Sequence, residues 1–337
     1  MRAYELSEFG IEALRVVECD VPEPGPGEVL IRFHAASLNY RDLMVVTGTY
    51  NPRMRLPTVP FSDGAGQVAA VGEGVTKWIV GDRVIPVFAQ RWFDGDPSAE
   101  KRKTSLGAGA PWHGVLREFG TFDAESLVRV PEHLSYEEAS TLPCSAVTAW
   151  NALFESGTLT PGETVLTLGT GGVSMFAIQF AKMAGARVFA TSGSRAKIER
   201  LSEFRVDETI NYRDEEDWDK AAIAFTDKVG VDHVVEVGGA GTLVRSINAT
   251  RIGGHVALIG ALTGAAGFNP TTVFMKSIRL QGIYTGSRRM FEEMNRAIAG
   301  NLMRPVIDRV FEFTEARNAL KHLESGSHFG KIVVRIA

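Results

Sequence analysis

The sequence contains very little cysteine. Cys19 and Cys144 are the two cysteines among 337 residues, so there is neither a disulfide framework nor a C-x-x-C metal or redox pair. No apolar run is long enough to cross a bilayer, and no basic start is followed by the apolar stretch of an export signal. We therefore expect a cytoplasmic protein that has no membrane partner.

An excess of charge of one sign is also lacking. The chain has 36 Lys and Arg against 40 Asp and Glu, which gives a formal net charge of −4. No block or stripe of basic residues stands out, and this argues against nucleic acid as a partner. With 45% hydrophobic residues, the composition is typical of an enzyme that acts on a small-molecule substrate, and the length suffices for two domains.

The most informative segment that is present is a glycine-rich turn, Gly-Thr-Gly-Gly-Val-Ser. It follows a strand-like run, Glu163–Leu168, and precedes a helix-like run, Met175–Ala184. A bare glycine run is more often only a turn, but in this setting backbone N–H groups can hold a pyrophosphate at a helix N-terminus. Ser174 stands where a third glycine is usual, and its hydroxyl could face a phosphate. The predicted cofactor-binding residues here are Gly169, Thr170, Gly171, Gly172, Val173 and Ser174.

A carboxylate is missing at the end of the next predicted strand, Arg187–Thr191. In NAD-selective folds an Asp or Glu at this place accepts hydrogen bonds from the ribose 2′-hydroxyl. Here Ser192, Arg195 and Lys197 follow instead, and the two cations can meet the 2′-phosphate of NADP. Alternatively Ser194 is only a helix N-cap and the cations are solvated, and the two interpretations are compatible. We predict NADPH as cofactor, with NADH as the alternative.

The pattern of elements predicts an α/β protein with two different parts. The first part, to about Phe122, contains short β-like runs broken by Pro and Gly, and from Tyr136 strands and helices alternate, which predicts a doubly wound parallel sheet. The last helices and strands, from Phe291 to Ile336, are expected to return to the first part. The predicted domains are 1–124, 125–275 and 276–337. The predicted strands are Val29–His34, Gly66–Val71, Asp82–Val87, Glu163–Leu168, Arg187–Thr191, Glu208–Asn211, Val231–Val237, His255–Ile259, Ile278–Tyr284, Val306–Phe311 and Lys331–Ile336.

Three motifs and the chain's last strand give a family resemblance. The motifs are Ser-Leu-Asn-Tyr-Arg-Asp-Leu (37–43), Pro-Phe-Ser-Asp-Gly-Ala-Gly (60–66) and Leu-Pro-Cys-Ser-Ala-Val-Thr-Ala-Trp (142–150), and the strand begins Gly-Lys-Ile-Val (330–333). Together with the glycine turn, they resemble the zinc-free branch of the medium-chain dehydrogenase/reductase superfamily, close to quinone oxidoreductases and enoyl reductases. The resemblance covers essentially the whole chain. It implies a GroES-like β-rich catalytic domain and a Rossmann domain, with the active site in the cleft between them.

The resemblance also locates the residues where a catalytic metal would be held. Zinc-dependent relatives have a Cys, a His-Glu pair and a second Cys at the positions of Asn39, Ser62-Asp63 and Cys144. An amide, a hydroxyl and one thiol are a poor donor set for zinc, so we predict no metal. Cys144 is either a remnant ligand or, as we favour, a small packing residue. The irregular segment Phe88–Gly120 lacks the four cysteines of a structural zinc lobe, and it is either a solvated loop with some satellite packing or a functional loop.

Further cofactor contacts follow from the resemblance alone. It places Tyr212 near the adenine ribose, Gly260 with the strand end at Ile283 and Tyr284 beside the nicotinamide, and Lys331 near the pyrophosphate. Thr148 and Tyr50 are further predicted cofactor contacts. The resemblance also implies a homodimer, in which the segments His255–Leu262 and Ile278–Tyr284 pair across a two-fold axis at the sheet edge.

Without zinc, hydrogen-bond donors have to stabilise the negative charge that hydride transfer leaves on a substrate. Asn39 supplies an amide, Tyr40 a phenol and Asp42 a carboxylate that can orient Arg41, and we predict Asn39, Tyr40 and Asp42 as catalytic. Alternatively, Arg41 and Asp42 are a structural pair. This chemistry favours an activated C=C bond or a quinone as substrate. The alternatives are a zinc-free NADP(H) alcohol dehydrogenase or carbonyl reductase, and a non-catalytic cofactor-binding protein.

Overall fold

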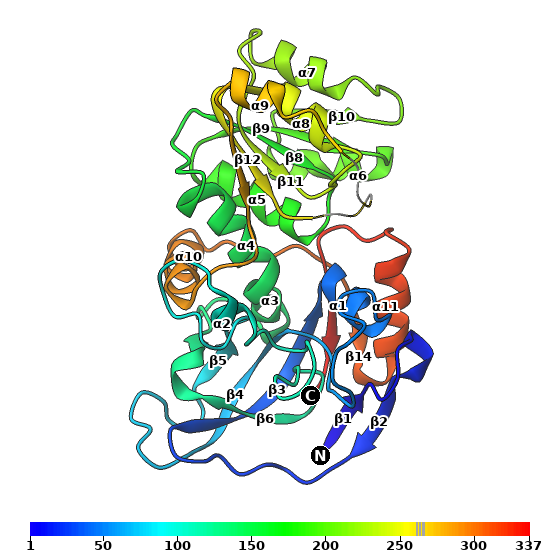
Figure 1. Ribbon diagram of the computed structural model, residues 1–337. Helices are drawn as coiled ribbons and strands as arrows, with labels where there is room; N and C mark the ends of the chain where they lie inside the picture. The colour runs from blue at the N-terminus through cyan, green and yellow to red at the C-terminus, as the bar shows by residue number, and fades with distance from the viewer. Residues whose placement is uncertain (261, 263, 265–266) are drawn as a thin grey trace. The chain divides into compact units, whose positions relative to one another are not determined.

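The computed structural model describes residues 1–260, 262, 264 and 267–337 (Figure 1). The chain forms two compact units: unit 1 is Met1–Val147 with Gly286–Ala337, and unit 2 is Thr148–Thr285. The predicted boundary after residue 124 is therefore wrong. Residues 125–147 belong to unit 1 because β7 (Leu127–Arg129) pairs with β5 (Arg83–Pro86), and α3 (Tyr136–Ser140) packs on the same sheet.

Unit 1 is built on a mixed β-sheet, as the β-like runs of the first part predict. β14 and β15 run parallel, and the other neighbouring strands pair antiparallel. The strands, in spatial order, are β14 (Ile307–Glu312), β15 (Lys331–Arg335), β3 (Glu28–Leu38), β4 (Asp63–Val71), β5 and β7, with β6 (Phe119–Asp123) paired to β3, and a separate pair is formed by β1 (Arg2–Glu5) and β2 (Arg15–Glu18).

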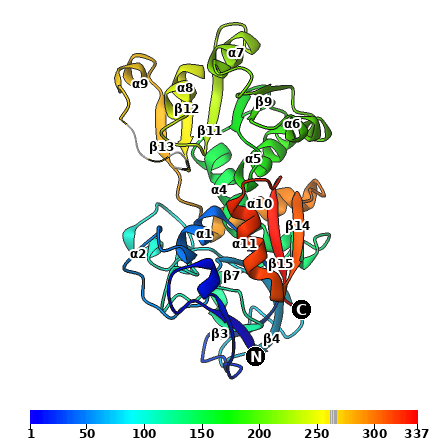
Figure 2. The same ribbon diagram turned by 90° about the vertical axis from the view of Figure 1, so that its right-hand side faces the viewer.

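The C-terminal segment returns to unit 1, as predicted. In Figure 1 the red C-terminal strand lies beside the blue strand β3, and the register places Ile332 opposite Leu38. This pairing brings Lys331 to the end of β3, although almost 300 residues separate them in sequence. α11 (Ala316–Glu324) buries Ala319, Leu320 and Leu323 and lies against β15 and β14 (Figure 2). The remaining helical segments of unit 1 are η1 (Ile11–Ala13), α1 (Tyr40–Val46), α2 (Ala99–Arg102), η2 (Ala124–Ser126), the π-helical turn η3 (Leu142–Ala146), α10 (Arg288–Gly300) and η6 (Phe313–Glu315).

The segment Phe88–Gly120 of unit 1 is packed rather than simply solvated. Trp92 and Leu106 are buried, and the Trp92 indole donates a hydrogen bond to the Gly95 carbonyl oxygen at 2.8 Å. The short helix α2 begins after Ser98, whose hydroxyl accepts from the Lys101 backbone N–H. The satellite packing that the first interpretation included is therefore present around Trp92 and Leu106.

Unit 2 is the parallel sheet that the alternating pattern predicts. The chain winds outward from β8 to β10, then crosses back and winds outward from β11 to β13, so the order reverses between β8 and β11. In doubly wound sheets a ligand site lies at this reversal, at the carboxyl ends of the strands. The strands, in spatial order, are β10 (Glu208–Asn211), β9 (Arg187–Ser192), β8 (Thr164–Leu168), β11 (Val231–Glu236), β12 (Thr250–Leu258) and β13 (Arg279–Gly282).

Helices alternate with these strands. α5 begins directly after the glycine turn and buries Met175, Phe176 and Phe180 as it packs against β8 and β9. The helical segments at the start of unit 2 and within it are α4 (Val147–Trp150), the π-helical turn η4 (Asn151–Glu155), α5 (Gly172–Met183), α6 (Arg195–Leu201), η5 (Ser202–Phe204), α7 (Trp218–Phe225), α8 (Leu243–Ala249) and α9 (Thr271–Met275). In the part of the chain that the structure describes, none of the helices combines the length and apolarity that a membrane crossing requires.

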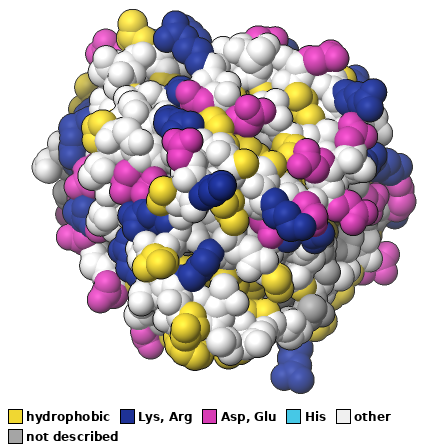
Figure 3. Space-filling view, turned by 90° about the horizontal axis from the view of Figure 1, so that it is seen from above, with side chains coloured by type: hydrophobic (Ala, Val, Ile, Leu, Met, Phe, Trp, Pro, Cys, Tyr) yellow, Lys and Arg dark blue, Asp and Glu magenta, His cyan; other side chains and the backbone are white. Residues whose placement is uncertain are grey.

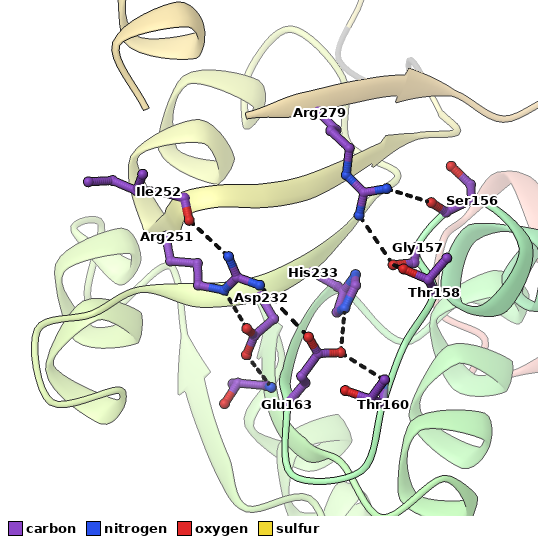
Figure 4. A network of polar contacts seen from close by, with 11 residues as sticks. Ser156, Gly157, Thr158, Thr160, Glu163, Asp232, His233, Arg251, Ile252 and Arg279 are labelled. Atoms are coloured by element: carbon purple, nitrogen blue, oxygen red, sulfur yellow. Dashed lines mark hydrogen bonds and ion pairs between the residues drawn. The ribbon is translucent and has the colours of Figure 1, made fainter. Parts of the chain in front are cut away.

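A polar network joins β11 and β13 to the loops before β8 (Figure 4). The His233 Nε2 atom lies 3.0 Å from the Glu163 carboxylate. The Arg279 guanidinium donates to the carbonyl oxygens of Ser156 and Gly157, each at 3.3 Å. These bonds satisfy backbone carbonyl groups where the chain enters the sheet.

Candidate functional site

The residues at the four would-be metal positions lie together in unit 1. Asn39 follows β3 and is the N-cap of α1, Ser62 and Asp63 stand at the start of β4, and Cys144 lies in η3. The Asn39 amide Nδ2 is 3.4 Å from the Ser62 hydroxyl oxygen, and the Cys144 backbone N–H donates to the Asp63 carboxylate at 3.0 Å. The fold thus brings these residues into one polar cluster, which we call the Asn39 cluster.

A buried lysine completes the Asn39 cluster. The Lys331 Nζ atom donates to the Leu38 carbonyl oxygen and to the Asn39 Oδ1 atom, both at 2.6 Å, and lies 3.3 Å from the Ser145 hydroxyl. The Ser145 hydroxyl in turn donates to Asn39 Oδ1 at 2.9 Å. Sequence reasoning expected Lys331 near a pyrophosphate and missed this arrangement. The pairing register of β15 with β3 creates this arrangement, and no local sequence motif predicts that register.

These contacts fix the orientation of the Asn39 amide. An ammonium group can only donate, so the Asn39 atom that faces Lys331 must be the oxygen. The Ser62 hydroxyl donates to Asp63 at 2.7 Å and therefore accepts from Asn39 Nδ2. One hydrogen of Nδ2 is used in this way, and the other has no partner among the described residues. The arrangement leaves one oriented amide donor available to a ligand.

Asp42 holds the loop that carries Asn39. Its carboxylate accepts from the Asn39 backbone N–H at 2.9 Å and from the Arg41 guanidinium at 3.3 Å, and it is completely buried. Burial raises the pKa of Asp42 to about 6, against the opposing effect of Arg41. This is the structural pair that the sequence offered as the alternative to a catalytic Asp42, and a catalytic role stays a prediction.

Tyr40 and Tyr50 differ in their surroundings. Tyr40 is the first residue of α1 and is 48% exposed, so its phenol is accessible. Tyr50 is half-buried against the core of unit 1, and the Arg41 guanidinium lies 5.1 Å from its ring centre. Tyr40 is therefore the better placed of the two for proton transfer to a bound molecule.

In unit 2 the glycine turn has the geometry of an anion site at a helix N-terminus. Gly169 adopts φ 69°, and its N–H donates to the Thr191 carbonyl oxygen at 2.8 Å. Gly171 is the N-cap of α5 and offers no side chain to the free N–H groups of Gly172 and Val173. A Cβ atom at Gly169 or Gly171 would meet nothing within 4 Å, so the space before the helix is open. Thr170, between them, is buried. These residues fit a pyrophosphate group.

Ser174 differs from the expectation. Its side chain is buried, and its hydroxyl donates to the Leu168 carbonyl oxygen at 2.7 Å instead of facing a phosphate. The serine thus satisfies the carbonyl group at the end of β8. The available signal was a serine in the first turn of a helix, because a serine hydroxyl in that place commonly forms a hydrogen bond to nearby backbone.

The end of β9 carries the cations that the sequence singled out. Ser194 caps α6, because its hydroxyl accepts from the Lys197 backbone N–H, and the buried Ser192 hydroxyl accepts from Ser194 N–H. The predicted N-cap is thus confirmed. Arg195 is exposed and pairs with Asp214 at 3.2 Å. Sequence reasoning missed Asp214, which lies 19 positions further along the chain.

The other predicted cofactor residues of unit 2 follow β10, β12 and β13, except Thr148, which lies in α4. A Cβ atom at Gly193 would come within 2.6 Å of the Tyr212 hydroxyl, so Tyr212 lies close against the turn after β9. Gly260 follows β12 and packs against the backbone of Val237. A Cβ atom at Gly260 would lie 2.1 Å from the Val237 carbonyl oxygen. The remaining three are Thr148 and Ile283, which are buried, and Tyr284, which is half-buried.

Glu236, at the end of β11, was also missed. Its buried carboxylate accepts from the backbone N–H groups of Gly238 and Gly239 at 2.8 and 2.9 Å, and from the hydroxyls of Thr242 and Ser246. It fixes the loop at the carboxyl edge of the sheet. A carboxylate just before Gly-Gly at a strand end was the available signal.

Comparison with known sequences gives two domain matches. Residues 25–132 match the family model described as alcohol dehydrogenase GroES-like domain, and residues 172–300 match that described as zinc-binding dehydrogenase. A zinc-type alcohol dehydrogenase-like protein of Schizosaccharomyces pombe is 40% identical over 336 residues, which cover 97% of this chain and 96% of that protein. The chain belongs to the medium-chain dehydrogenase/reductase superfamily.

Other members of the superfamily differ in the chemistry their names state. Acryloyl-coenzyme A reductase of Metallosphaera sedula is 28% identical, with 96% of each chain covered, and quinone oxidoreductase of Lama guanicoe is 27% identical, with 99% and 97% covered. The crystal structure of an NAD-dependent alcohol dehydrogenase matches with a TM-score of 0.91 at 33% identity, covering all of both chains. A mycobacterial structure complexed with NADPH matches with a TM-score of 0.83 at 27% identity, with the same coverage. These relatives make the chain an oxidoreductase and leave its substrate open.

The Asn39 cluster of this superfamily member does not fit a catalytic zinc ion. Asn39 Oδ1 already accepts from an ammonium group, which would repel a second cation. Cys144 is the only thiol at the four positions, and burial raises its pKa, which disfavours the thiolate form in the absence of a metal. Among residues 1–260, 262, 264 and 267–337 no group of three or more His, Cys, Asp or Glu is placed to hold a metal. No step below is routed through zinc.

Proposed function

We propose that the protein is an NADPH-dependent oxidoreductase that reduces an activated C=C bond or a quinone without zinc. The observation that carries this proposal is the Lys331 ammonium 2.6 Å from the Asn39 side-chain oxygen. It places a positive charge and an oriented amide donor where zinc-dependent relatives hold their metal. Acryloyl-coenzyme A reductase and quinone oxidoreductase among the relatives support this substrate class.

The cluster would act on the negative charge that forms on the substrate oxygen. A bound reduced nicotinamide supplies the hydride. The free Asn39 Nδ2 hydrogen donates to the developing oxyanion, and the positive charge of Lys331 on the far side of the amide strengthens that donor. Asp63 and Ser62 hold the other Nδ2 hydrogen, so the amide need not reorient during the reaction.

The strength of this donor set matches a delocalised anion. Hydride transfer to the β-carbon of an enone, or to a quinone, leaves charge spread over several atoms, and hydrogen bonds suffice to stabilise it. Protonation then comes from Tyr40, whose phenol is accessible, or from water. An isolated ketone would leave a localised alkoxide, which needs a stronger Lewis acid.

The preference for NADPH rests on the end of β9. Arg195 and Lys197 follow the strand with no carboxylate between Arg187 and Lys197 to repel a 2′-phosphate. Asp214 holds Arg195 in an exposed ion pair, which a phosphate can replace at little cost because exposed pairs are weak. The NADPH-bound relative supports this choice, whereas the NAD-dependent relative shows that the superfamily uses both cofactors.

The test is the initial rate of NADPH and NADH oxidation with quinones, enones, enoyl thioesters and isolated ketones. We expect turnover with members of the first three classes and a higher kcat/KM with NADPH. Turnover of secondary alcohols with NADP+ while enones stay inert would favour the alcohol dehydrogenase instead. Absence of turnover with every class would leave a non-catalytic cofactor-binding protein.

We further propose a homodimer that forms along β13 and no association with nucleic acid. β13 is the edge strand of the unit 2 sheet, and an unpaired edge favours pairing with a second copy. On the face drawn in Figure 3, basic and acidic side chains are interspersed, which does not favour a polyanion. Sedimentation of the wild type and of Gln281→Pro, which interrupts the edge, should give a dimer and a monomer, respectively. A wild-type monomer at micromolar concentration would contradict the dimer.

A further inference from the structure

A cavity lies in unit 1, lined by residues that the proposed reaction does not use. It has a volume of about 660 Å³ and is lined by the segment Phe88–Gly120, the start of β3 and the turns before β5 and after β6. Its apolar walls include Leu106, Trp112 and Phe122. A cavity of this size and mixed lining is typical of a small-molecule site.

The cavity contains an arginine that lacks a counter-ion. The Arg117 guanidinium lies 5.7 Å from the centre of the Phe122 ring. Its Nε atom is buried without a hydrogen-bond partner, and no hydrogen bond or ion pair joins the guanidinium to any residue that the structure describes. Burial lowers the pKa of Arg117 to about 10, so the group is still charged at neutral pH. A charged side chain that is partly withdrawn from water and has no counter-ion costs stability, and a bound anion would relieve that cost.

A second arginine also lines this cavity. Arg91 lines the same cavity, lies 5.6 Å from the Trp112 ring centre and forms no ion pair with a described residue. Burial, with a smaller contribution from the charge of Arg117, lowers the pKa of His113, which lines the cavity.

The carboxylates at the rim are already engaged. Glu125 pairs with Lys77 at 3.6 Å and with Arg288, and Asp123 accepts from the Glu125 backbone N–H at 2.8 Å. Glu28 accepts from the Gly25 backbone N–H at 3.0 Å. None of these three acids forms an ion pair with Arg117.

We propose that this cavity binds a small organic anion, in which a carboxylate or phosphate group pairs with Arg117 and an apolar or planar part packs against Trp112 and Phe122. The planar guanidinium can hold either group through two parallel hydrogen bonds. The site is independent of the Asn39 cluster, and its ligand need not be a substrate.

The experiment measures binding of sodium benzoate, phenyl phosphate and inorganic phosphate by calorimetry and by tryptophan fluorescence. Benzyl alcohol is the neutral control, and the full chain is used. We expect saturable binding of benzoate or phenyl phosphate, with little binding of benzyl alcohol. Comparison of benzoate with phenyl phosphate shows whether the site prefers a carboxylate or a phosphate group. Binding of inorganic phosphate shows how much affinity the charged group contributes alone. Trp112→Phe should remove the fluorescence response and leave the calorimetric one.

The decisive variant is Arg117→Met, which removes the charge but keeps much of the side-chain volume. We expect it to weaken anion binding at least ten-fold, with NADPH oxidation unchanged. Arg309→Met is the matched control, because Arg309 also stacks on an aromatic ring in unit 1, 4.5 Å from the Phe311 centre. If Arg117→Met does not fold, Arg117→Lys is tested instead. It keeps the positive charge but loses the paired donors of the guanidinium, so we expect an intermediate loss of affinity. Anion binding that is equal in the wild type and the Arg117 variants, or absent at millimolar concentration in the wild type, would overturn the proposal.

Discussion

Lys331 places a positive charge beside the Asn39 carboxamide, inside a cluster that also contains the buried carboxylates of Asp42 and Asp63. Burial lowers the pKa of Lys331, whereas Asp63 and Asp42 oppose that effect by favouring its charged form. At the scale of single residues the ammonium therefore has two effects. It holds the amide in one orientation, and it offsets the negative charge of the two acids.

The first prediction concerns Lys331→Met. Loss of the ammonium frees the Asn39 amide to rotate, so we expect kcat to fall ten- to hundred-fold while KM for NADPH changes less than three-fold. Lys331→Arg, which keeps the charge, should recover part of kcat. Steady-state kinetics with a quinone or enone separates the two parameters. A rise in KM for NADPH at constant kcat would instead favour the pyrophosphate contact that the sequence suggested.

The second prediction concerns Arg195→Ala. Removal of the guanidinium should raise KM for NADPH about ten-fold and leave KM for NADH nearly unchanged, because only NADPH carries the 2′-phosphate. Arg296→Ala is the matched control, since Arg296 is an exposed arginine on α10 in unit 1. Equal effects on both cofactors would exclude a 2′-phosphate contact for Arg195.

What the sequence predicts at this scale depends on distance along the chain. Arg195, Lys197 and the glycine turn belong to short motifs, so their chemistry can be read locally. Lys331 and Asn39 lie 292 positions apart and meet only because β15 pairs with β3, and no local motif indicates that contact. The family resemblance supplied the four would-be ligand positions, but not the charge that stands beside them.

At the scale of the elements, the unit 2 sheet carries a pair of buried histidines on neighbouring strands. His233 on β11 and His255 on β12 have ring centres 5.8 Å apart, and Ser156 lies 3.0 Å from His255 Nε2. His255 is 1% exposed, and burial, with the fields of His233 and Arg279, lowers its pKa from 6.5 to about 4. The sheet therefore contains a site that resists protonation.

The third prediction is a loss of stability in mild acid. The folded pKa of His255 lies below its unfolded value, so the unfolded chain takes up the proton first as the pH falls. Stability from this group is present above pH 6.5 and is lost as the pH falls toward 4. Each pKa unit corresponds to about 1.4 kcal/mol, so roughly 3 kcal/mol should be lost by pH 4.

Thermal unfolding of the wild type and His255→Asn between pH 4 and 8 checks this prediction. The variant should unfold at a lower temperature at pH 7, because it leaves a cavity, but its Tm should fall less between pH 7 and 4. From pH 7 to 8 the two curves should run parallel. A variant whose Tm falls as steeply as that of the wild type would show that His255 does not control the acid response.

Element types were well predicted because strands and helices have different periods. The strands β8, β9, β10 and β11 begin and end within one residue of the predicted limits. β12 is longer than predicted and the edge strand β13 is shorter, because strand length depends on pairing with neighbouring strands as well as on a strand's own pattern. The contact of the buried Ser174 hydroxyl could likewise not be predicted from the helix pattern, because its acceptor, the Leu168 carbonyl oxygen, belongs to the preceding strand.

At the scale of the whole molecule, unit 2 is inserted into the sequence of unit 1. Unit 1 contains both ends of the chain, and residues 148–285 form unit 2 between them. The sequence predicted the return of the C-terminal segment, but it placed the first boundary 23 residues too early. The short elements β7 and α3 lie in that interval, and only tertiary pairing with β5 and β3 assigns them to unit 1.

The proposed zinc-free chemistry also belongs to the whole molecule, because β3, β4, β15 and η3 or the residues next to them each contribute part of the Asn39 cluster. The fourth prediction, which tests this claim most directly, is the kcat of the purified protein with NADPH and a responsive quinone or enone before and after exhaustive dialysis against a zinc chelator. Asn39→Ala serves as the matched control for loss of the amide donor. We predict the same kcat after dialysis, no gain when zinc is added back, and a loss of at least ten-fold in Asn39→Ala. Activity that disappears with the chelator and returns with zinc would contradict the account.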